Sequence, residues 1–79
     1  MAHTTRQDPA LQAAVGQRLR EHRLRAGRRQ WELAAAAGIT QAAVSTYEHG
    51  RGRLSLTTAM HIAVALGTSL DAMFGGLLV

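Results

Sequence analysis

The sequence lacks cysteine and is poor in proline and aromatic residues. None of its 79 residues is cysteine, and it has one proline, one tryptophan, one tyrosine and one phenylalanine. Without cysteine the chain has no disulfide framework, no thiolate nucleophile and no cysteine-based zinc site of the kind that stabilises many small domains. A chain of this length buries only a modest fraction of its surface. We therefore expect one domain held by packing, and we do not expect a two-domain enzyme with a substrate cleft.

Acidic residues are scarce, and long apolar runs are absent. Nine basic residues, all arginine, stand against five acidic ones, which gives a formal net charge of +4. Six of the arginines lie between Arg18 and Arg29, and two more are Arg51 and Arg53. Such a basic excess favours a polyanionic partner. No apolar run could span a membrane, and the first residues lack the apolar stretch of a signal peptide, so we expect a cytoplasmic protein with no membrane partner.

Alanine is abundant, which favours helices throughout the chain. We predict an all-α fold of five helices, whose starts are marked by Asp8, Thr40, Ser55 and Ser69 and most of whose ends are marked by glycines. The expected ranges are about 9–26, 30–37, 41–49 and 56–66, followed by a short helix containing Leu70, Met73 and Phe74. Residues 1–8 are expected to form a flexible N-terminal arm, and residues 9–79 the domain itself.

Residues at three- and four-residue spacing indicate which face of each helix turns towards the core. The expected inner positions are Val15, Leu19, His22, Arg23 and Ala26 in the first helix, Leu33, Ala34 and Ala37 in the second, and Val44 and Tyr47 in the third. In the fourth helix they are Leu56, Met60, Ala63 and Leu66, or close neighbours such as Ala59 and Ile62. Arg18, Glu21 and Arg25 are expected outside this face.

Residues 30–50 carry the functional signal. Two short helices joined by a tight turn containing Gly38, the second with a polar outer face, meet the physical requirement for a helix-turn-helix that inserts one helix into a DNA major groove. The outer face of the second helix presents Gln41, Ala42, Ser45, Thr46 and His49, with no acidic residue among them. The alternative is that these residues form an ordinary solvated helix face.

The chain resembles the Xre class of helix-turn-helix proteins, which includes phage repressors and Cro. The resemblance covers residues 15–74 without a gap. The matching residues are Val15, Gly16, Arg18, Leu19, Arg20, Arg23, Gln30, Glu32, Leu33, Ala34, Gly38, Ile39, Thr40, Val44, Ser45, Glu48, Gly50, Ser55, Leu56, Ile62, Ala63, Ala65, Leu66, Gly67, Ser69, Leu70 and Phe74. It implies a compact, lambda-repressor-like fold of five helices and binding to double-stranded DNA.

The resemblance also implies roles for individual positions. Gln41, Ala42 and Thr46 match the positions that contact DNA bases, and Ser45 is expected to assist them. A glutamine can form hydrogen bonds with the edge of adenine. Contacts to the DNA backbone fall to Gln30, at the start of the second helix, and to Arg51 and Arg53 in the following loop. Arg23 and Glu48 match a structural pair that joins the first helix to the third.

Several positions depart from the family pattern. Arg29 replaces the usual serine or threonine N-cap, Arg28 replaces an apolar residue, and Leu54 replaces a common proline. His22 replaces a residue that is usually aliphatic and in the core, and Trp31 occupies a position that is usually polar. We include Arg28, Arg29, Thr40 and His49 among the residues expected near the DNA backbone, although a solvated helix end is an equal interpretation for His49.

Metal binding and catalysis are not expected. The four histidines, His3, His22, His49 and His61, are scattered without paired ligand spacing, and no serine has an obvious base. We therefore predict no cofactor, no metal site and no small-molecule ligand.

The C-terminal segment is apolar. Exposed apolar patches usually mark an interface, so we predict a dimer interface formed by Met73, Phe74, Leu77, Leu78 and Val79. Alternatively Leu70, Met73 and Phe74 close the monomer core, which we expect of at least Leu70 and Phe74. A two-fold dimer would place two recognition helices about 34 Å apart on a near-palindromic operator.

The sequence as a whole predicts a homodimeric transcriptional regulator, a repressor or an autoregulatory controller. A controller of a restriction-modification system, a small phage repressor and an antitoxin all remain open. The rival interpretation is a protein-interaction module whose basic surface is secondary. Steep salt dependence of DNA binding would separate the two.

Overall fold

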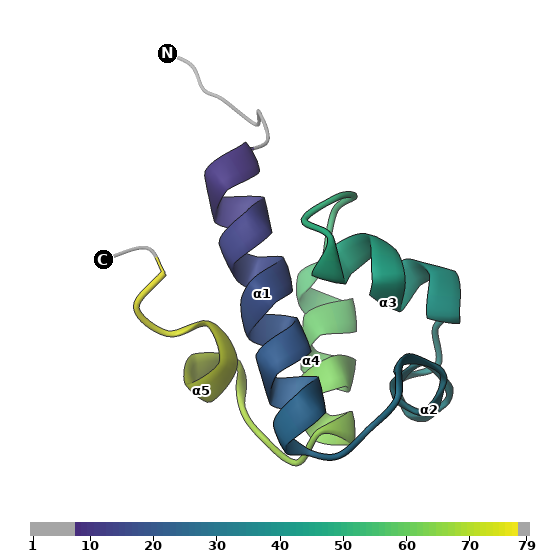
Figure 1. The fold of residues 1–79 in the computed structure, drawn as a ribbon. Coiled ribbons are helices and arrows are strands. Elements are labelled where there is room, and N and C mark those ends of the chain that lie inside the picture. The colour runs from purple at the N-terminus through teal and green to yellow at the C-terminus, as the bar shows by residue number, and fades with distance from the viewer. Residues whose placement is uncertain (1–7, 78–79) are drawn as a thin grey trace.

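Five α-helices and no strand make up residues 8–77, the part of the chain that this computed structural model describes. The helices are α1 (Pro9–Arg25), α2 (Gln30–Ala37), α3 (Gln41–Glu48), α4 (Leu56–Ala65) and α5 (Leu70–Phe74). Helix α1 packs against α3 on one side and α5 on the other, while α4 packs against α2 and α5 (Figure 1). The predicted all-α fold of five helices is confirmed, with each predicted boundary within about one residue of the observed one.

The helix starts follow the predicted capping residues. The Asp8 carboxylate accepts the backbone N–H groups of Ala10 and Leu11, and the Thr40 hydroxyl accepts that of Ala43 at 3.0 Å. Ser55 and Ser69 cap α4 and α5 in the same way. These side chains satisfy amides that have no partner inside the helix, which stabilises each helix start by about 1 kcal/mol.

Helix α2 begins differently. Arg29 offers no side-chain cap, and instead its backbone N–H donates to the Glu32 carboxylate at 2.7 Å. A glutamate in the third helical position is one half of a capping box, and its negative charge also lies at the positive end of the helix dipole. Because Arg29 stands in the N-cap position, α2 lacks the usual side-chain cap. The contact from Glu32 partly compensates for this loss of stability.

The core is made by one or more residues from every helix. It contains Leu19, Leu33, Ala34, Ala37, Val44, Ile62, Ala63 and Met73, with Ala59 also buried. The largest of these side chains are fully buried, and each contributes about 1.5–3 kcal/mol of hydrophobic stabilisation. This confirms the inner faces predicted for α2 and, through Leu19, Arg23 and Val44, the main positions of α1 and α3.

Some inner-face predictions are wrong. Ala26 is exposed because it lies beyond the last turn of α1, as its C-cap. Leu56 and Met60 are 67% and 50% exposed, because the core side of α4 is the one that carries Ala59, Ile62 and Ala63. The alternative positions, Ala59 and Ile62, are the buried ones.

Arg18 also differs from its predicted place on the outside of α1. Its Nη1 atom donates to the carbonyl of Met73 at 3.0 Å and to that of Gly75 at 3.3 Å. These carbonyls lie at the end of α5, where a helix has no internal donors left. Arg18 therefore connects α1 to the C-terminal end of α5.

Gly16 sets the distance between α1 and α3. A β-carbon at this position would overlap the backbone oxygen of Tyr47 and lie 2.8 Å from that of Glu48. Glycine is required here because the two backbones approach too closely for any side chain.

Candidate nucleic-acid interface

Helices α2 and α3 are joined by a short turn at Gly38. Gly38 has φ +74°, a left-handed conformation that favours glycine, and the next residue, Ile39, donates its backbone N–H to Ala34 at 3.0 Å. Thr40 then caps α3. The chain thus ends one helix and starts the next within three residues, Gly38–Thr40, which is the helix-turn-helix arrangement predicted from the sequence.

Helix α3 turns an uncharged face outward. Val44 is fully buried and Tyr47 packs against the core, which leaves Gln41, Ala42 and Thr46 exposed on the other side. Ser45 is half-buried beside them. Of the residues predicted to read bases, three are therefore accessible and the fourth lies at the edge of the accessible face.

His49 lies at the C-cap of α3 and contacts Ser45. Its Nδ1 atom lies 2.7 Å from the Ser45 backbone oxygen and 3.5 Å from the Ser45 hydroxyl. Because a carbonyl oxygen only accepts, Nδ1 carries the hydrogen in the shorter contact.

A buried polar network lies behind the recognition face. The Arg23 Nε and Nη2 atoms donate to the Glu48 carboxylate at 2.5 and 3.0 Å, and Arg23 Nη1 donates to the Arg28 carbonyl at 2.8 Å. The hydrogen bond that Arg23 donates to Glu48 raises the pKa of Arg23 above the ordinary arginine value; burial opposes this shift, and the negative charge of Glu48 adds to it. This network joins α1, α3 and the loop before α2.

Gln30 belongs to the same network. Its Nε2 atom donates to Glu48 at 3.0 Å, and its side chain is half-buried. An amide nitrogen carries two hydrogens, so one remains for another acceptor. The hydrogen bond to Glu48 thus orients the Gln30 side chain. The sequence did not indicate this contact.

Exposed arginines flank α2 and α3. Arg28 and Arg29 lie before α2, and Arg51 and Arg53 lie in the loop after α3. The pair Arg23–Glu48 is the only ion pair among residues 8–77, so these four guanidinium groups have no acidic partner within that range. Their charge is available to a polyanion.

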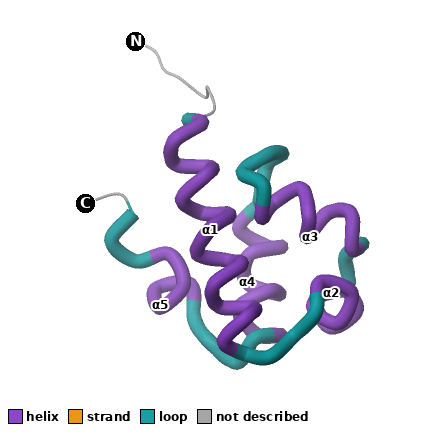
Figure 2. Tube along the Cα trace, viewed as in Figure 1, coloured by secondary structure: helices purple, strands orange, loops and turns teal. Residues whose placement is uncertain are grey.

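The loop that follows α3 lies beside the N-terminal half of α1 (Figure 2). Gln12 of α1 donates from Nε2 to the carbonyl of Gly52 at 3.1 Å. Sequence reasoning missed this contact, because Gln12 and Gly52 are 40 residues apart and no periodic pattern connects them.

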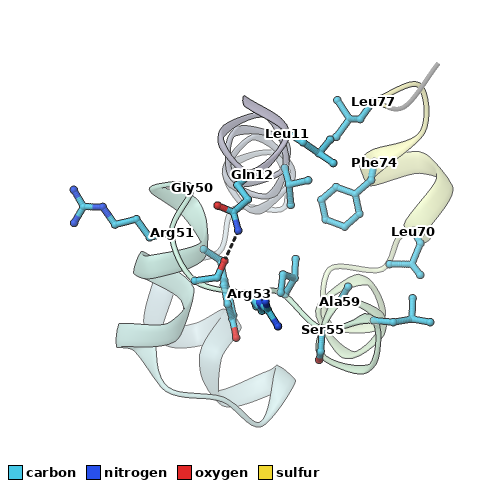
Figure 3. Close-up of a pocket in the computed structure, with 15 residues that line it drawn as sticks. Leu11, Gln12, Gly50, Arg51, Arg53, Ser55, Ala59, Leu70, Phe74 and Leu77 are labelled. Atoms are coloured by element: carbon cyan, nitrogen blue, oxygen red, sulfur yellow. Dashed lines mark hydrogen bonds between the residues drawn. The ribbon is translucent and has the colours of Figure 1, made fainter. Parts of the chain in front are cut away.

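An apolar groove of about 690 Å³ lies on the other side of this loop (Figure 3). Its walls come from α1, the loop, the start of α4, and α5 with the residues after it. The apolar lining residues include Leu11, Val15, Leu54, Leu56, Leu70, Phe74 and Leu77. Among residues 8–77 no acidic side chain lines it, and its charged lining residues are Arg51 and Arg53.

The residues predicted to form the dimer interface differ in their exposure. Met73 is fully buried in the core cluster of the monomer, so its side chain has no exposed surface to offer an interface. Phe74 and Leu77 are half-buried and line the groove. Leu78 and Val79 lie outside the described residues. Leu70 and Phe74 pack against the core, as expected.

Histidine, aspartate and glutamate side chains are dispersed among the described residues. No three histidine, aspartate or glutamate side chains gather there in a cluster that could hold a metal ion. His3 lies outside residues 8–77. Within the same range no helix is long and apolar enough to cross a membrane.

Comparison with known families decides the class of this fold. A helix-turn-helix family model matches residues 19–73, which include the C-terminal part of α1, both helices of the motif, α4 and most of α5. The chain belongs to this helix-turn-helix family. The resemblance inferred from the sequence is confirmed.

Similar proteins in the family are named as regulators. A transcriptional regulator in the ATPase CF(0) region of Rhodospirillum rubrum, described as uncharacterized, is 36% identical over 67 residues, which are 85% of this chain and 62% of the relative. This chain thus matches less than two thirds of that relative's length.

Two solved structures have the same fold, and this chain covers more of their own length. The restriction-modification controller protein C.AhdI from Aeromonas hydrophila superposes with a TM-score of 0.80 at 34% identity, over 82% of this chain and 98% of that one. The clp gene regulator ClgR from C. glutamicum superposes with a TM-score of 0.83 at 29% identity, over 91% and 92%.

Proposed function

We propose that this helix-turn-helix protein is a transcriptional regulator that binds double-stranded DNA sequence-specifically by inserting α3 into the major groove. The observation that carries the proposal is the exposed, uncharged face of α3, flanked by two pairs of arginines that have no acidic partner within residues 8–77. Uncharged donors and acceptors read base edges, and the arginines neutralise phosphates on either side. The names of the related proteins support a regulatory role.

Individual residues take distinct parts in this proposal. Gln41, Ala42 and Thr46 face the bases, and Ser45 supports them from the edge of the face. Backbone contacts come from Gln30, Arg28, Arg29, Thr40, His49, Arg51 and Arg53. The Arg23–Glu48 pair holds α3 and Gln30 in place from behind. The chain acts by binding and needs no cofactor or catalytic step, in the cytoplasm where it meets DNA.

Selection from random duplex DNA tests the proposal. The protein is incubated with the pool at near-physiological salt, and the bound DNA is sequenced alongside that of Gln41→Ala and Thr46→Ala. Each substitution should relax the preference at defined bases, by about 1–3 kcal/mol for a bidentate contact. The matched controls are Gln17→Ala on α1 and Thr57→Ala on α4, both exposed residues that should leave the selected sequence unchanged. No enriched sequence at any salt would overturn base-specific binding.

We propose that the active form is a homodimer that covers the apolar groove. The groove carries apolar side chains that one copy leaves accessible, including Leu56, Phe74 and Leu77. A two-fold axis there would place two copies of α3 on one face of the DNA, about one turn apart, and the preferred operator would be near-palindromic. DNA binding would then respond to the concentration of the chain itself, as repression or autoregulation requires.

Sedimentation velocity over a range of concentrations tests the dimer. Leu56→Glu should shift the equilibrium to monomer, because it places a charge in the covered groove. Val64→Glu is the matched control, since Val64 is 78% exposed on the same helix and does not line the groove. A monomer at all concentrations, or equal effects of the two substitutions, would contradict the proposed interface.

A second candidate is a protein-interaction module, including an antitoxin, favoured by the same apolar groove. Salt dependence separates it from the first. Binding to DNA by six to ten neutralised phosphates loses about three to five orders of magnitude in affinity between 50 and 200 mM salt, whereas apolar docking of a protein does not.

A further inference from the structure

The loop between α3 and α4 carries Arg51 and Arg53 on an irregular backbone. Residues 51–53 are all exposed, and no helix of their own holds them. A guanidinium on such a loop binds a phosphate well only if the backbone is ordered beforehand, because ordering it on binding costs conformational entropy.

The start of the loop is fixed at Gly50. Its N–H donates to the Tyr47 carbonyl at 3.0 Å, and the N–H of Arg51 donates to that of Thr46 at 3.0 Å. Gly50 has φ +73°, and a β-carbon there would lie 2.9 Å from the α-carbon of Ala13. Gly50 thus rests directly on the backbone of α1.

Among residues 8–77, one side-chain hydrogen bond joins the tip of the loop to α1. The Nε2 atom of Gln12 donates to the Gly52 carbonyl at 3.1 Å (Figure 3). Gly52 lies between the two arginines, so this hydrogen bond acts at the peptide that separates them. In the same view, the Arg51 side chain extends away from the groove, on the side opposite Phe74 and Leu77.

We propose that Gln12 is a positioning residue of the DNA interface: it orders the loop tip through Gly52 so that Arg51 and Arg53 meet the phosphate backbone together. This inference rests on the proposed function. Gln12 itself lies one turn into α1 and is only partly exposed, and its effect on DNA passes through the two arginines.

A double-mutant cycle tests this role. Gln12→Ala is made in the natural chain and in Arg51→Ala/Arg53→Ala, and affinity for one duplex of fixed sequence is measured by fluorescence anisotropy at several salt concentrations. Gln17→Ala in both backgrounds is the matched control, because it removes an exposed glutamine from the same helix. Thermal unfolding of each variant checks that the fold is intact.

The proposal predicts coupling between Gln12 and the arginines. Gln12→Ala should weaken binding about threefold to tenfold in the natural chain, the range of one net hydrogen bond, and less than about twofold when both arginines are absent. It should also make the slope of log affinity against log salt shallower, as expected when phosphate contacts are lost. Gln17→Ala should change neither quantity.

Different outcomes would contradict the role of Gln12 and the proposed function. An equal loss in both backgrounds, or no loss from Gln12→Ala while the natural chain binds DNA, would overturn the role of Gln12 and leave the proposed function intact. Absence of DNA binding by the natural chain would overturn the proposed function and this role with it.

Discussion

The guanidinium of Arg23, in the last turns of α1, binds the carboxylate of Glu48, the last residue of α3, through two hydrogen bonds. The two side chains are 9% and 1% exposed. Burial of two charges costs much of what their attraction contributes, so the pair by itself adds little net stability. Its importance lies in what removal of one member leaves behind, and in the orientation that it imposes on Gln30 and α3.

Arg23→Ala should destabilise the fold by about 3–5 kcal/mol, because it leaves the Glu48 carboxylate buried without its cation. Urea unfolding followed by circular dichroism measures this loss. Arg20→Ala, an exposed arginine on the same helix, is the control and should change the free energy of unfolding by less than about 0.5 kcal/mol. Similar losses for both variants would show that the pair has no special role.

The contribution of this pair should not depend on pH between neutrality and moderately alkaline conditions. The Glu48 hydrogen bond raises the pKa of Arg23 in the folded state, so the associated stability is fully present below the ordinary arginine pKa and is lost only as pH rises through the higher folded value. The difference in unfolding free energy between the natural chain and Arg23→Ala should stay constant from about pH 7 to about pH 10. A decline within that window would contradict the assignment.

Gly16→Ala should destabilise the protein even though alanine favours a helix by about 1 kcal/mol over glycine. The added methyl group would overlap the backbone oxygens of Tyr47 and Glu48 and force α1 and α3 apart, at a cost of about 1–3 kcal/mol or more. Because α3 would move, DNA affinity should fall as well. Gln17→Ala, at the neighbouring exposed position, should leave the melting temperature nearly unchanged; a stabilised Gly16→Ala would refute the close approach.

Met73→Ala should act on the monomer. Met73 is fully buried in the core, so its truncation should cost about 2–5 kcal/mol of folding free energy. Leu77→Ala should cost the monomer much less, because Leu77 is only half-buried at the groove. Unfolding is followed at concentrations where the transition no longer depends on protein concentration, which separates folding from association. Equal costs for the two residues would place Met73 at the surface.

The sequence by itself determined the features that depend on a few neighbouring residues. Asp8, Thr40, Ser55 and Ser69 cap the amides of the turn that follows each of them, and Gly38 permits the left-handed turn. These are local interactions, so the ranges of the helices and the helix-turn-helix could be predicted. The Glu32 contact to the Arg29 amide is equally local, and the glutamate three residues after the cap position was the signal for it.

Only the tertiary structure decided which helix each side chain meets. Periodicity gives the direction of a residue around its own helix but not the position of the neighbouring helices. The burial of Met73 and the contact of Arg18 with α5 follow from how α5 lies against α1, and the exposure of Leu56 follows from how α4 lies against α2 and α5. The bond from Gln12 to Gly52, which joins residues 40 positions apart, exists only because α1 passes beside the loop after α3.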